Sequence, residues 1–215
     1  MLTILTETSS AANQFLFEMR HKDIQKHRGR FRNNMKRLGM AMALKMSEKM
    51  SYRSVEVETP LGSKLMKVLS EDLVLITILR AGSAFLEGFQ EIFDDATIGF
   101  IGAYRMESGD SAPAIEMNYK ALPETAGKTV ILVDPMLATG HSMIDAAQLI
   151  SESGKPARIY YVSAVAAPEG VNYIREKNKL PYEIWTGSLD EKLNASAYIV
   201  PGLGDAGDLS YGAKI

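Results

Sequence analysis

The sequence predicts an α/β fold in which helices cover both faces of a parallel sheet. Three runs of mostly aliphatic residues, 73–79, 129–133 and 157–165, have no polar face, which is typical of strands buried on both sides. Each run leads into a short loop of small residues and then into apolar residues at helical spacing. This repeated alternation of strand and helix indicates a Rossmann-like parallel sheet flanked by helices.

The composition of the chain excludes several classes of site and of binding partner. With 215 residues, 46% of them hydrophobic, the chain can bury one sizeable core, and we expect a single domain over residues 1–215. A formal net charge of −2 argues against nucleic-acid binding through bulk electrostatics. The absence of cysteine excludes disulfide scaffolds, thiolate zinc sites and cysteine nucleophiles. Without a signal-peptide pattern or a run of ~20 apolar residues, we expect a cytoplasmic protein with no membrane contact.

Helices are expected within the N-terminal region, residues 10–50. After an edge strand at residues 2–5, apolar residues recur every three or four positions along 13–20 and 31–50. The second segment carries a methionine-rich stripe, a pattern more typical of core or subunit interface than of a cofactor site: Phe31, Met35, Leu38, Met42 and Met46. The positive charges of residues 21–32 are typical of a solvated helix face.

Alternation and turn residues place the remaining elements. Residues 54–59 alternate apolar and charged side chains, as a half-exposed strand does, and Pro60 ends the pattern. A strand at 97–103 runs into a second alternating segment, so residues 101–120 are expected to form a β-hairpin arm. The same criteria give helices over 84–92 and 171–177 and a strand over 182–186, whose Trp185 is expected in the core.

The loop after the strand 129–133 has the features of an anion site. It joins the carboxyl end of a parallel strand to a helix N-terminus, where unpaired N–H groups and the helix dipole favour anions. Gly140 lets the main chain approach a phosphate closely, while Thr139 and Ser142 add hydroxyl donors. Asp134, an acceptor-only group at the strand end, suits sugar hydroxyls. We infer a ribose 5-phosphate as the ligand, although an ordinary turn remains an alternative on these residues alone.

A second strand end, at residues 78–83, presents an arginine beside small residues. Arg80 followed by Ala81, Gly82 and Ser83 can grip a diphosphate through charge-assisted, bidentate hydrogen bonds. Taken alone, this loop is better explained by an arginine at a helix N-terminus that pairs with a surface carboxylate. Two such loops in one sheet favour the diphosphate site.

Two nucleotide-binding motifs fail on their context. Gly202, Gly204 and Gly207 satisfy G-x-G-x-x-G, but only eight residues follow, which leaves no room for the helix and second strand of a dinucleotide site. Gly127-Lys128-Thr129 lacks the earlier glycine of a P-loop and precedes a strand instead of a helix. Both motifs are therefore rejected.

Three motifs together resemble the uracil phosphoribosyltransferases of the type I phosphoribosyltransferase family. They are ILRAG at 78–82, DPMLATGHS at 134–142 and YIVPGLGDAGD at 198–208, and their order and spacing agree with that family over nearly the whole chain. The resemblance implies that the substrates are uracil and phosphoribosyl diphosphate (PRPP) and the products UMP and diphosphate. It also implies a C-terminal hood at about residues 185–215 and identifies 101–120 as the family's arm.

Residue by residue, the resemblance assigns two sets of contacts. The implied PRPP-binding residues are Arg80, Arg105, Asp134, Pro135, Met136, Leu137, Ala138, Thr139, Gly140, His141, Ser142 and Asp205. Uracil is expected on the main chain of Ile199, Gly204, Asp205 and Ala206, because its acceptor, donor, acceptor edge can be matched by backbone groups of a rigid loop. Asp205 and Arg105 are the implied catalytic residues.

The resemblance further implies Mg²⁺ as the cofactor, bound through PRPP near Asp205 without direct protein ligands. GTP is implied as a candidate effector, and a homodimer or homotetramer is expected. Two departures from the family pattern stand out: His141 replaces a common glycine, and Leu209 occupies a usually basic position. The alternatives are a phosphoribosyltransferase for another base, which should carry two acidic residues at 134–135, and an RNA-binding pyrimidine-gene regulator, which should carry a basic face.

Overall fold

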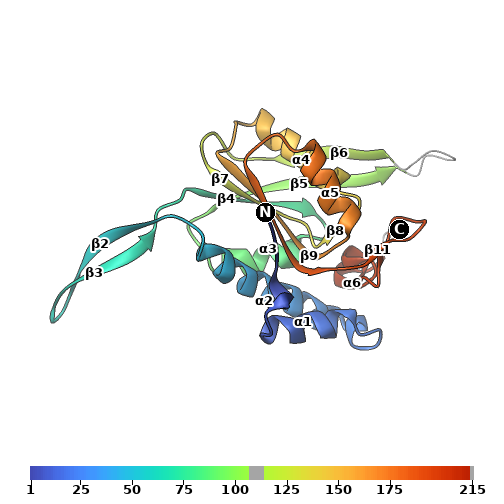
Figure 1. The fold of residues 1–215 in the computed structure, drawn as a ribbon, viewed down its shortest axis with the longest axis horizontal. Helices are drawn as coiled ribbons and strands as arrows, with labels where there is room; N and C mark the ends of the chain where they lie inside the picture. Colours follow the sequence, from blue (N-terminus) through green and yellow to red (C-terminus); the bar gives the residue numbers. More distant parts are fainter. Residues whose placement is uncertain (107–113, 214–215) are drawn as a thin grey trace.

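The computed structural model describes residues 1–106 and 114–213, except for the side chains of 103–106 and 114–118. Its main sheet confirms the predicted α/β fold (Figure 1). The strands lie in the order β1 (Leu2–Ile4), β10 (Tyr182–Leu189), β9 (Arg158–Ala166), β7 (Thr129–Val133), β4 (Leu73–Leu79), β5 (Thr97–Met106) and β6 (Ala114–Ala121), and the short β8 (Met136–Leu137) pairs with β9. Every pairing in this sheet is parallel except that of β5 with β6.

Helices cover both faces of this sheet, and each face has its own core. One layer contains α1 (Ala11–Arg20), α2 (Arg28–Ser47) and α3 (Ser83–Gln90), with the short helices η1 (Leu5–Glu7) and η2 (Ile24–Lys26); the other contains α4 (His141–Glu152) and α5 (Pro168–Lys177). Strand β7 is buried on both sides: Ile131 packs in the first core and Leu132 in the second. Neither these helices nor any other in the described residues is long and apolar enough to cross a membrane.

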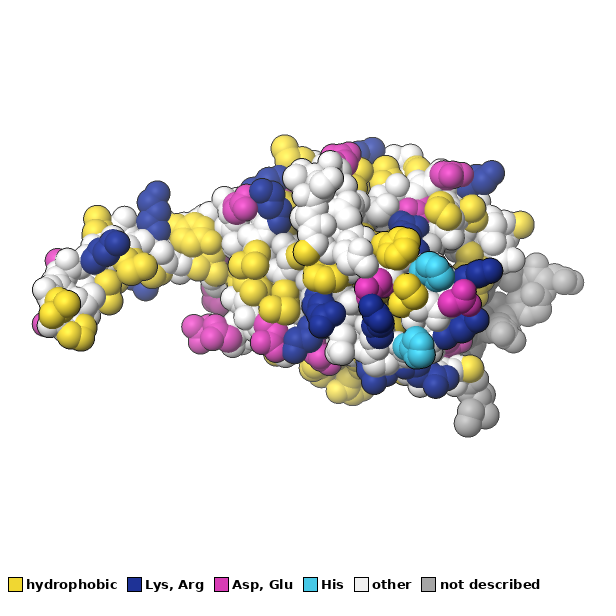
Figure 2. Space-filling model, turned by 90° about the horizontal axis from the view of Figure 1, so that it is seen from below, with side chains coloured by type: hydrophobic (Ala, Val, Ile, Leu, Met, Phe, Trp, Pro, Cys, Tyr) yellow, Lys and Arg dark blue, Asp and Glu magenta, His cyan; other side chains and the backbone are white. Residues whose placement is uncertain are grey.

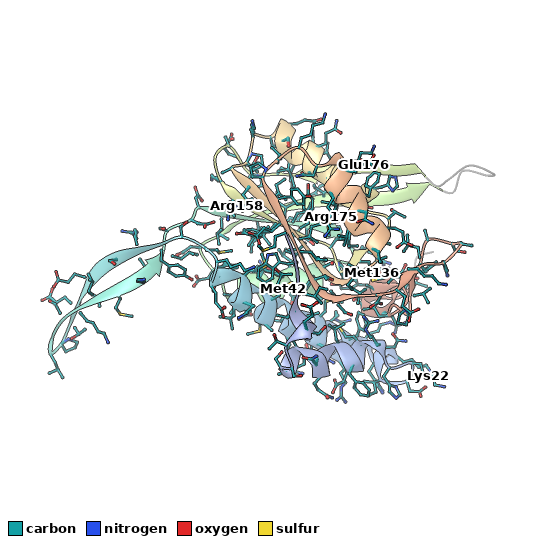
Figure 3. The ribbon with its side chains drawn as sticks, in the orientation of Figure 1. Lys22, Met42, Met136, Arg158, Arg175 and Glu176 are labelled. Atoms are coloured by element: carbon teal, nitrogen blue, oxygen red, sulfur yellow. The ribbon has the colours of Figure 1, made fainter. Side chains whose placement is uncertain are left out.

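The methionine-rich stripe of α2 is core. Its five residues are at most 1% exposed, and Figure 3 places Met42 on the side of α2 that faces the sheet. Trp185 is also buried, as expected. The positively charged segment 21–32 is mostly exposed. Within it, the exposed Arg30 donates to Glu18, and the partly buried Arg32 donates to the Ser210 carbonyl.

A second hairpin was not predicted in full. The expected hairpin over 101–120 is formed by β5 and β6, and its turn, 107–113, lies outside the described residues. Strands β2 (Tyr52–Thr59) and β3 (Gly62–Leu69) form a separate two-stranded sheet that projects from the body (Figure 1). Only the first of these strands was expected, because the adjacent Leu65 and Met66 break the alternation that would have indicated β3.

The strand order creates a switch point between β4 and β7. From β4 the chain moves outward to β5 and β6, and then returns to build β7, β9 and β10 on the other side of β4. Helix α3 after β4 and helix α4 after β7 therefore belong to opposite layers, and the loops at the two strand ends separate. In open α/β sheets, ligands bind in the crevice at such a point.

The C-terminal segment closes over this crevice. After β10 the chain forms a small two-stranded sheet of β11 (Lys192–Leu193) and β12 (Ile199–Val200), and then α6 (Ala206–Tyr211), which lies against α2. Residues 185–189 of the expected hood belong to β10 of the main sheet. The structural hood therefore begins after that strand.

A buried carboxylate joins the first two helices. Glu18 of α1 accepts hydrogen bonds from Arg30 (2.8 Å, two bonds), Asn34 (2.7 Å) and Gln14 (3.1 Å). These hydrogen bonds, that of Arg30 foremost, lower the pKa of Glu18 from its ordinary 4.5 to about 2. The ionised form of Glu18 is thus stabilised in the folded protein.

We expect Glu18→Gln to be less stable than the wild type at pH 7 and equally stable near pH 2. Because the folded pKa is lowered, the contribution of Glu18 is fully present above the unfolded value of 4.5 and is lost as the pH falls toward 2. Urea midpoints of both proteins measured between about pH 7 and 2 test this. A midpoint difference that stays constant across that range would show that ionised Glu18 does not stabilise the fold.

Candidate functional site

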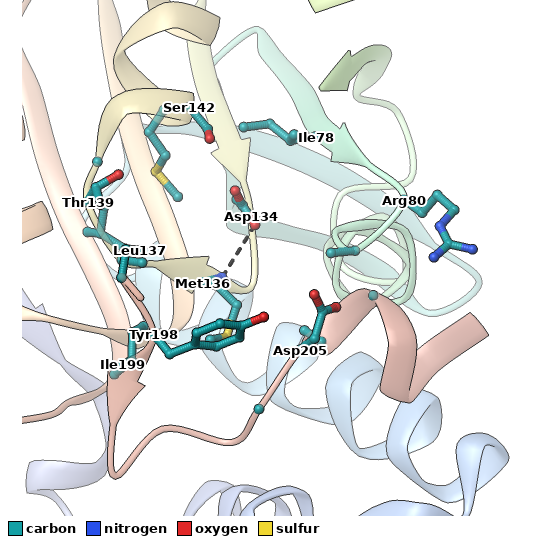
Figure 4. A pocket seen from close by; sticks show the side chains of 18 of the residues that line it. Ile78, Arg80, Asp134, Met136, Leu137, Thr139, Ser142, Tyr198, Ile199 and Asp205 are labelled. Carbon is teal, nitrogen blue, oxygen red and sulfur yellow. Dashed lines mark hydrogen bonds between the residues drawn. The ribbon is translucent and has the colours of Figure 1, made fainter. Parts of the chain in front are cut away.

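The two predicted loops and the C-terminal segment meet in one pocket. Its walls are the end of β4 with the β4–α3 loop, the β7–α4 loop, and residues 197–199 and 204–207 of the C-terminal segment. Figure 4 shows Asp134 and Asp205 on facing walls, with Arg80 at one side. The parallel pairing of β4 with β7 brings the first two loops to the same edge of the sheet, since Thr77 lies opposite Val133.

The β7–α4 loop has the backbone geometry of an anion site. Gly140 has φ +86° and precedes the 12-residue helix α4. A β-carbon at this position would lie 2.9 Å from the Gly170 oxygen and 3.2 Å from Tyr173, so glycine is required both by conformation and by space. At the other end of the loop, the Asp134 carboxylate accepts a hydrogen bond from the Met136 N–H (3.3 Å).

Arg80 is held against the C-terminal segment. Its Nη2 donates to Asp208 Oδ1 (3.3 Å) and to the Gly212 carbonyl (3.2 Å). Its Nε is buried and has no hydrogen-bond partner in the described part of the chain. Since a buried donor without a partner is costly, Arg80 retains a capacity to donate to an acceptor that enters the pocket.

The C-terminal loop is folded against the core. Ile199, Leu203 and Ala206 are buried and pack in the same core as α2. The exposed Asp205 caps α6, because its Oδ1 accepts a hydrogen bond from the Asp208 N–H (2.9 Å). A loose tail is therefore excluded for this segment.

Most of the predicted site residues line the pocket. They are Arg80, Asp134, Met136, Leu137, Ala138, Thr139, Gly140, Ser142, Ile199, Gly204, Asp205 and Ala206. Pro135 and His141 are adjacent to the pocket but do not line it, and the exposed His141 ring lies on Tyr173 of α5 with ring centroids 4.2 Å apart. Arg105 lies in β5 opposite Ile115, but its side chain is outside the described residues.

Tyr198 also lines the pocket and was not predicted as a site residue. Its half-exposed ring lies beside Met136 in Figure 4, with its hydroxyl toward Asp205. An aromatic ring is a natural contact for a planar base. The signal was present in the sequence, because Tyr198 directly precedes the expected base-binding Ile199.

The titratable groups of the pocket do not include histidine. Among the described lining residues, Asp134, Asp205, Tyr198 and Arg80 are ionisable, and no His/Cys/Asp/Glu group of three that could hold a metal occurs in the described part of the chain. Asp134 and Asp205 are the only carboxylates among the described lining residues.

Known proteins are similar to this chain over nearly its full length. A family model described as uracil phosphoribosyltransferase matches residues 6–213. A uracil phosphoribosyltransferase of Porphyromonas gingivalis is 42% identical over 206 residues, covering 96% of this chain and 95% of its own, and that of Malacoplasma penetrans is 41% identical, covering 91% and 93%. A solved protein structure from Aquifex aeolicus, 35% identical, superposes over 100% of both chains with a TM-score of 0.89.

The architecture is shared more widely. A hypoxanthine phosphoribosyltransferase of Staphylococcus aureus has a TM-score of 0.51 over 75% of this chain and 76% of its own, at 13% identity. This likeness concerns the fold alone.

Proposed function

The chain belongs to the uracil phosphoribosyltransferase family, and from that premise we propose how its pocket performs the reaction. The enzyme is a pentosyltransferase that transfers the 5-phosphoribosyl group of PRPP to N1 of uracil, giving UMP and diphosphate in pyrimidine salvage. The observation that carries the assignment is that the phosphate-type loop 134–142 and the glycine-rich loop 199–206 border one pocket.

The 5′-phosphate is assigned to the β7–α4 loop. Ala138 to Ser142 bring main-chain N–H groups and two hydroxyls to the N-terminus of α4, where the helix dipole favours an anion. His141 takes part through its main chain, because its ring packs on Tyr173 instead of entering the pocket. Asp134 accepts hydrogen bonds from the ribose hydroxyls. The ribose 5-phosphate is thereby held both at its phosphate and at its hydroxyls.

The diphosphate is assigned to the Arg80 side of the pocket. Arg80 offers its unpartnered Nε, and it exchanges Asp208 and the Gly212 carbonyl for phosphate oxygens when PRPP binds. Arg105, in β5, is assigned a second contact to this group by resemblance. The described residues line a pocket in which a charged leaving group would be held close to the sheet edge.

Uracil is assigned to the C-terminal loop. The main chains of Ile199, Gly204, Asp205 and Ala206 border the pocket, and their N–H and C=O groups can match O2, N3–H and O4 of the base. Tyr198 and Met136 line the same pocket and contribute apolar surface to it. Cytosine would leave buried main-chain groups unpaired, which such a site rejects strongly.

The chemistry is displacement at C1′ of the ribose. The bond from uracil N1 to C1′ forms as the bond from C1′ to the diphosphate oxygen breaks; the N1 proton leaves to solvent and the electron pair leaves with diphosphate. The ribose gains positive charge on the way, and Asp134 and Asp205 face the space that it occupies. Positioning and charge stabilisation by these residues replace any covalent nucleophile.

Mg²⁺ is the proposed cofactor. When bound, it neutralises charge on the diphosphate and so makes it a better leaving group. Asp205, and Asp134 across the pocket, would hold its water ligands, which fits a pocket where the described residues provide no three-ligand cage.

An assay with separate bases tests the function. The purified protein is given PRPP, Mg²⁺ and one of uracil, cytosine, orotate or hypoxanthine, and nucleotide and diphosphate are quantified. We expect UMP from uracil, with cytosine disfavoured on the order of 10⁴-fold. Nucleotide formed from hypoxanthine or orotate would contradict the base assignment, and PRPP binding without any turnover would favour the RNA-binding regulator.

We further propose a homodimer or homotetramer that associates through the β2–β3 hairpin. The methionine stripe is buried within one chain, whereas the hairpin exposes Leu61 (100%), Leu65 (68%) and Met66 (50%). Figure 2 shows hydrophobic side chains along this projection. Sedimentation at micromolar concentration should give a multiple of 23.6 kDa, reduced by Leu61→Ser with Leu65→Ser. A wild-type monomer would contradict this assembly.

GTP as an effector and a cytoplasmic site of action are proposed from the family resemblance and the sequence alone. The base assay repeated with GTP at subsaturating PRPP tests the first of these. An unchanged rate would exclude activation under those conditions.

A further inference from the structure

An ion pair outside the pocket holds the turn that lies between the two parts of the proposed base-binding main chain. Arg20, the last residue of α1, donates from Nη1 to Asp190 Oδ2 (2.8 Å) and from Nη2 to Asp190 Oδ1 (2.5 Å). The Asp190 side chain is 3% exposed and that of Arg20 is 23% exposed. Such a bidentate pair fixes the relative position of the two groups it joins.

Both main-chain groups of Gly202 are bound by this pair. The Gly202 N–H donates to Asp190 Oδ2 (2.8 Å), and the Gly202 carbonyl accepts from Arg20 Nη1 (2.9 Å). Gly202 has φ +61°, and a β-carbon there would lie only 2.2 Å from the Ile199 oxygen, so the turn is tight and admits no side chain.

A neighbouring side chain holds the next residue. The Gln25 amide, in the orientation that the surrounding carbonyl oxygens require, donates to the Leu203 carbonyl (2.7 Å) and the Met19 carbonyl (2.9 Å). Within the described chain, the strand pairing of this segment ends at Val200, and no main-chain to main-chain hydrogen bond involves residues 202–204. Side chains from the N-terminal elements α1 and η2 therefore supply hydrogen bonds to this main chain that a neighbouring strand would supply in a sheet.

Building on the proposed function, we propose that Arg20 and Asp190 are positioning residues for uracil. Neither residue lines the pocket; they fix Gly202, which lies between Ile199 and Gly204, the two sides of the proposed base-binding main chain. A main-chain site must be rigid to discriminate bases, because a displacement of about 1 Å can cost on the order of 100-fold in rate. In the described part of the chain, none of the side-chain hydrogen bonds of the pair reaches the β7–α4 loop or Arg80, so its effect should fall on uracil alone.

Arg20→Lys and Asp190→Asn are the test variants. Lysine keeps the charge but cannot give the planar, bidentate fork, and asparagine replaces one of the two carboxylate acceptors by a donor. Arg30→Lys is the matched control, since it disturbs the bidentate Arg30–Glu18 pair between α1 and α2 without touching the loop. All variants are compared at temperatures where circular dichroism shows them folded.

Two readouts decide the proposal. In the base assay, both test variants should raise KM for uracil about 10- to 100-fold while KM for PRPP stays within about twofold, and Arg30→Lys should keep wild-type values. Hydrogen exchange at the amides of residues 202–206 should be faster in the test variants and unchanged in the control.

The positioning role of Arg20 and Asp190 can fail independently of the proposed function. Unchanged exchange at 202–206, or equal losses toward uracil and PRPP, would overturn the positioning role, because the pair would then serve stability alone. If the wild type forms no UMP, the proposed function fails, and the exchange experiment still decides whether Arg20 and Asp190 fix the loop.

Discussion

Replacing Asp205 by alanine is expected to lower kcat/KM for UMP formation by about 10²- to 10³-fold. The exposed Asp205 lines the pocket with Asp134. In the proposed mechanism, positive charge develops on the ribose between these two carboxylates as diphosphate leaves. Alanine removes that negative charge and also the cap of α6, which accepts the Asp208 N–H. Steady-state kinetics with uracil and PRPP varied in turn measure the loss.

The variant Asp205→Asn tests the negative charge of Asp205 separately from its role as the N-cap of α6. Asparagine is as good an N-cap as aspartate, so α6 should keep its start and the fold its stability. If the charge matters, the asparagine variant loses nearly as much activity as the alanine variant. Wild-type activity in Asp205→Asn would show that the carboxylate has only a capping role.

Replacing Gly140 by alanine is expected to raise KM for PRPP by about 10- to 100-fold. The residue has φ +86°, which costs a non-glycine residue roughly 1–2 kcal/mol. Its β-carbon would also lie 2.9 Å from the Gly170 oxygen, so the loop must move away from α5. The phosphate-binding main chain would move with it.

Gly127→Ala is the matched control for this substitution. Gly127 has φ +72°, but a β-carbon there meets no atom within 4 Å, and the residue does not line the pocket. The control should therefore lose a similar amount of stability in urea unfolding and keep its KM for PRPP. Equal KM changes in both variants would mean that backbone strain, and not the fit against α5, disturbs the site.

Much of the fold and of the site could be predicted because their signals are local. The strands around 73–79, 129–133 and 157–165 were evident as apolar runs, and burial on both faces confirms them. Gly140 and Asp134 were found because a strand end, a glycine and a helix start occur within a few residues. The sequence also indicated that both loops belong to one parallel sheet, and the pairing of β4 with β7 brings them to the same edge.

The features of the fold and the site that the sequence did not predict depend mostly on contacts between distant segments. Arg20 and Asp190 are 170 positions apart. Nothing in the sequence near Arg20 distinguishes an arginine that binds a distant loop from one on a solvated helix face. The contact of Arg80 with Asp208 likewise joins residues 128 positions apart. Strand β3 was missed for a different reason: its exposed apolar residues follow no period, because a projecting hairpin buries neither face within the chain.

The most direct test is a crystal structure of the protein with UMP, the product that contains both the phosphate and the base. We expect the 5′-phosphate against the main chain of residues 138–142, the ribose hydroxyls on Asp134, and the pyrimidine edge hydrogen-bonded to the main chain of Ile199 and Gly204–Ala206. UMP bound in the opposite direction, with its base beside Ala138–Ser142, or bound outside this pocket, would contradict it.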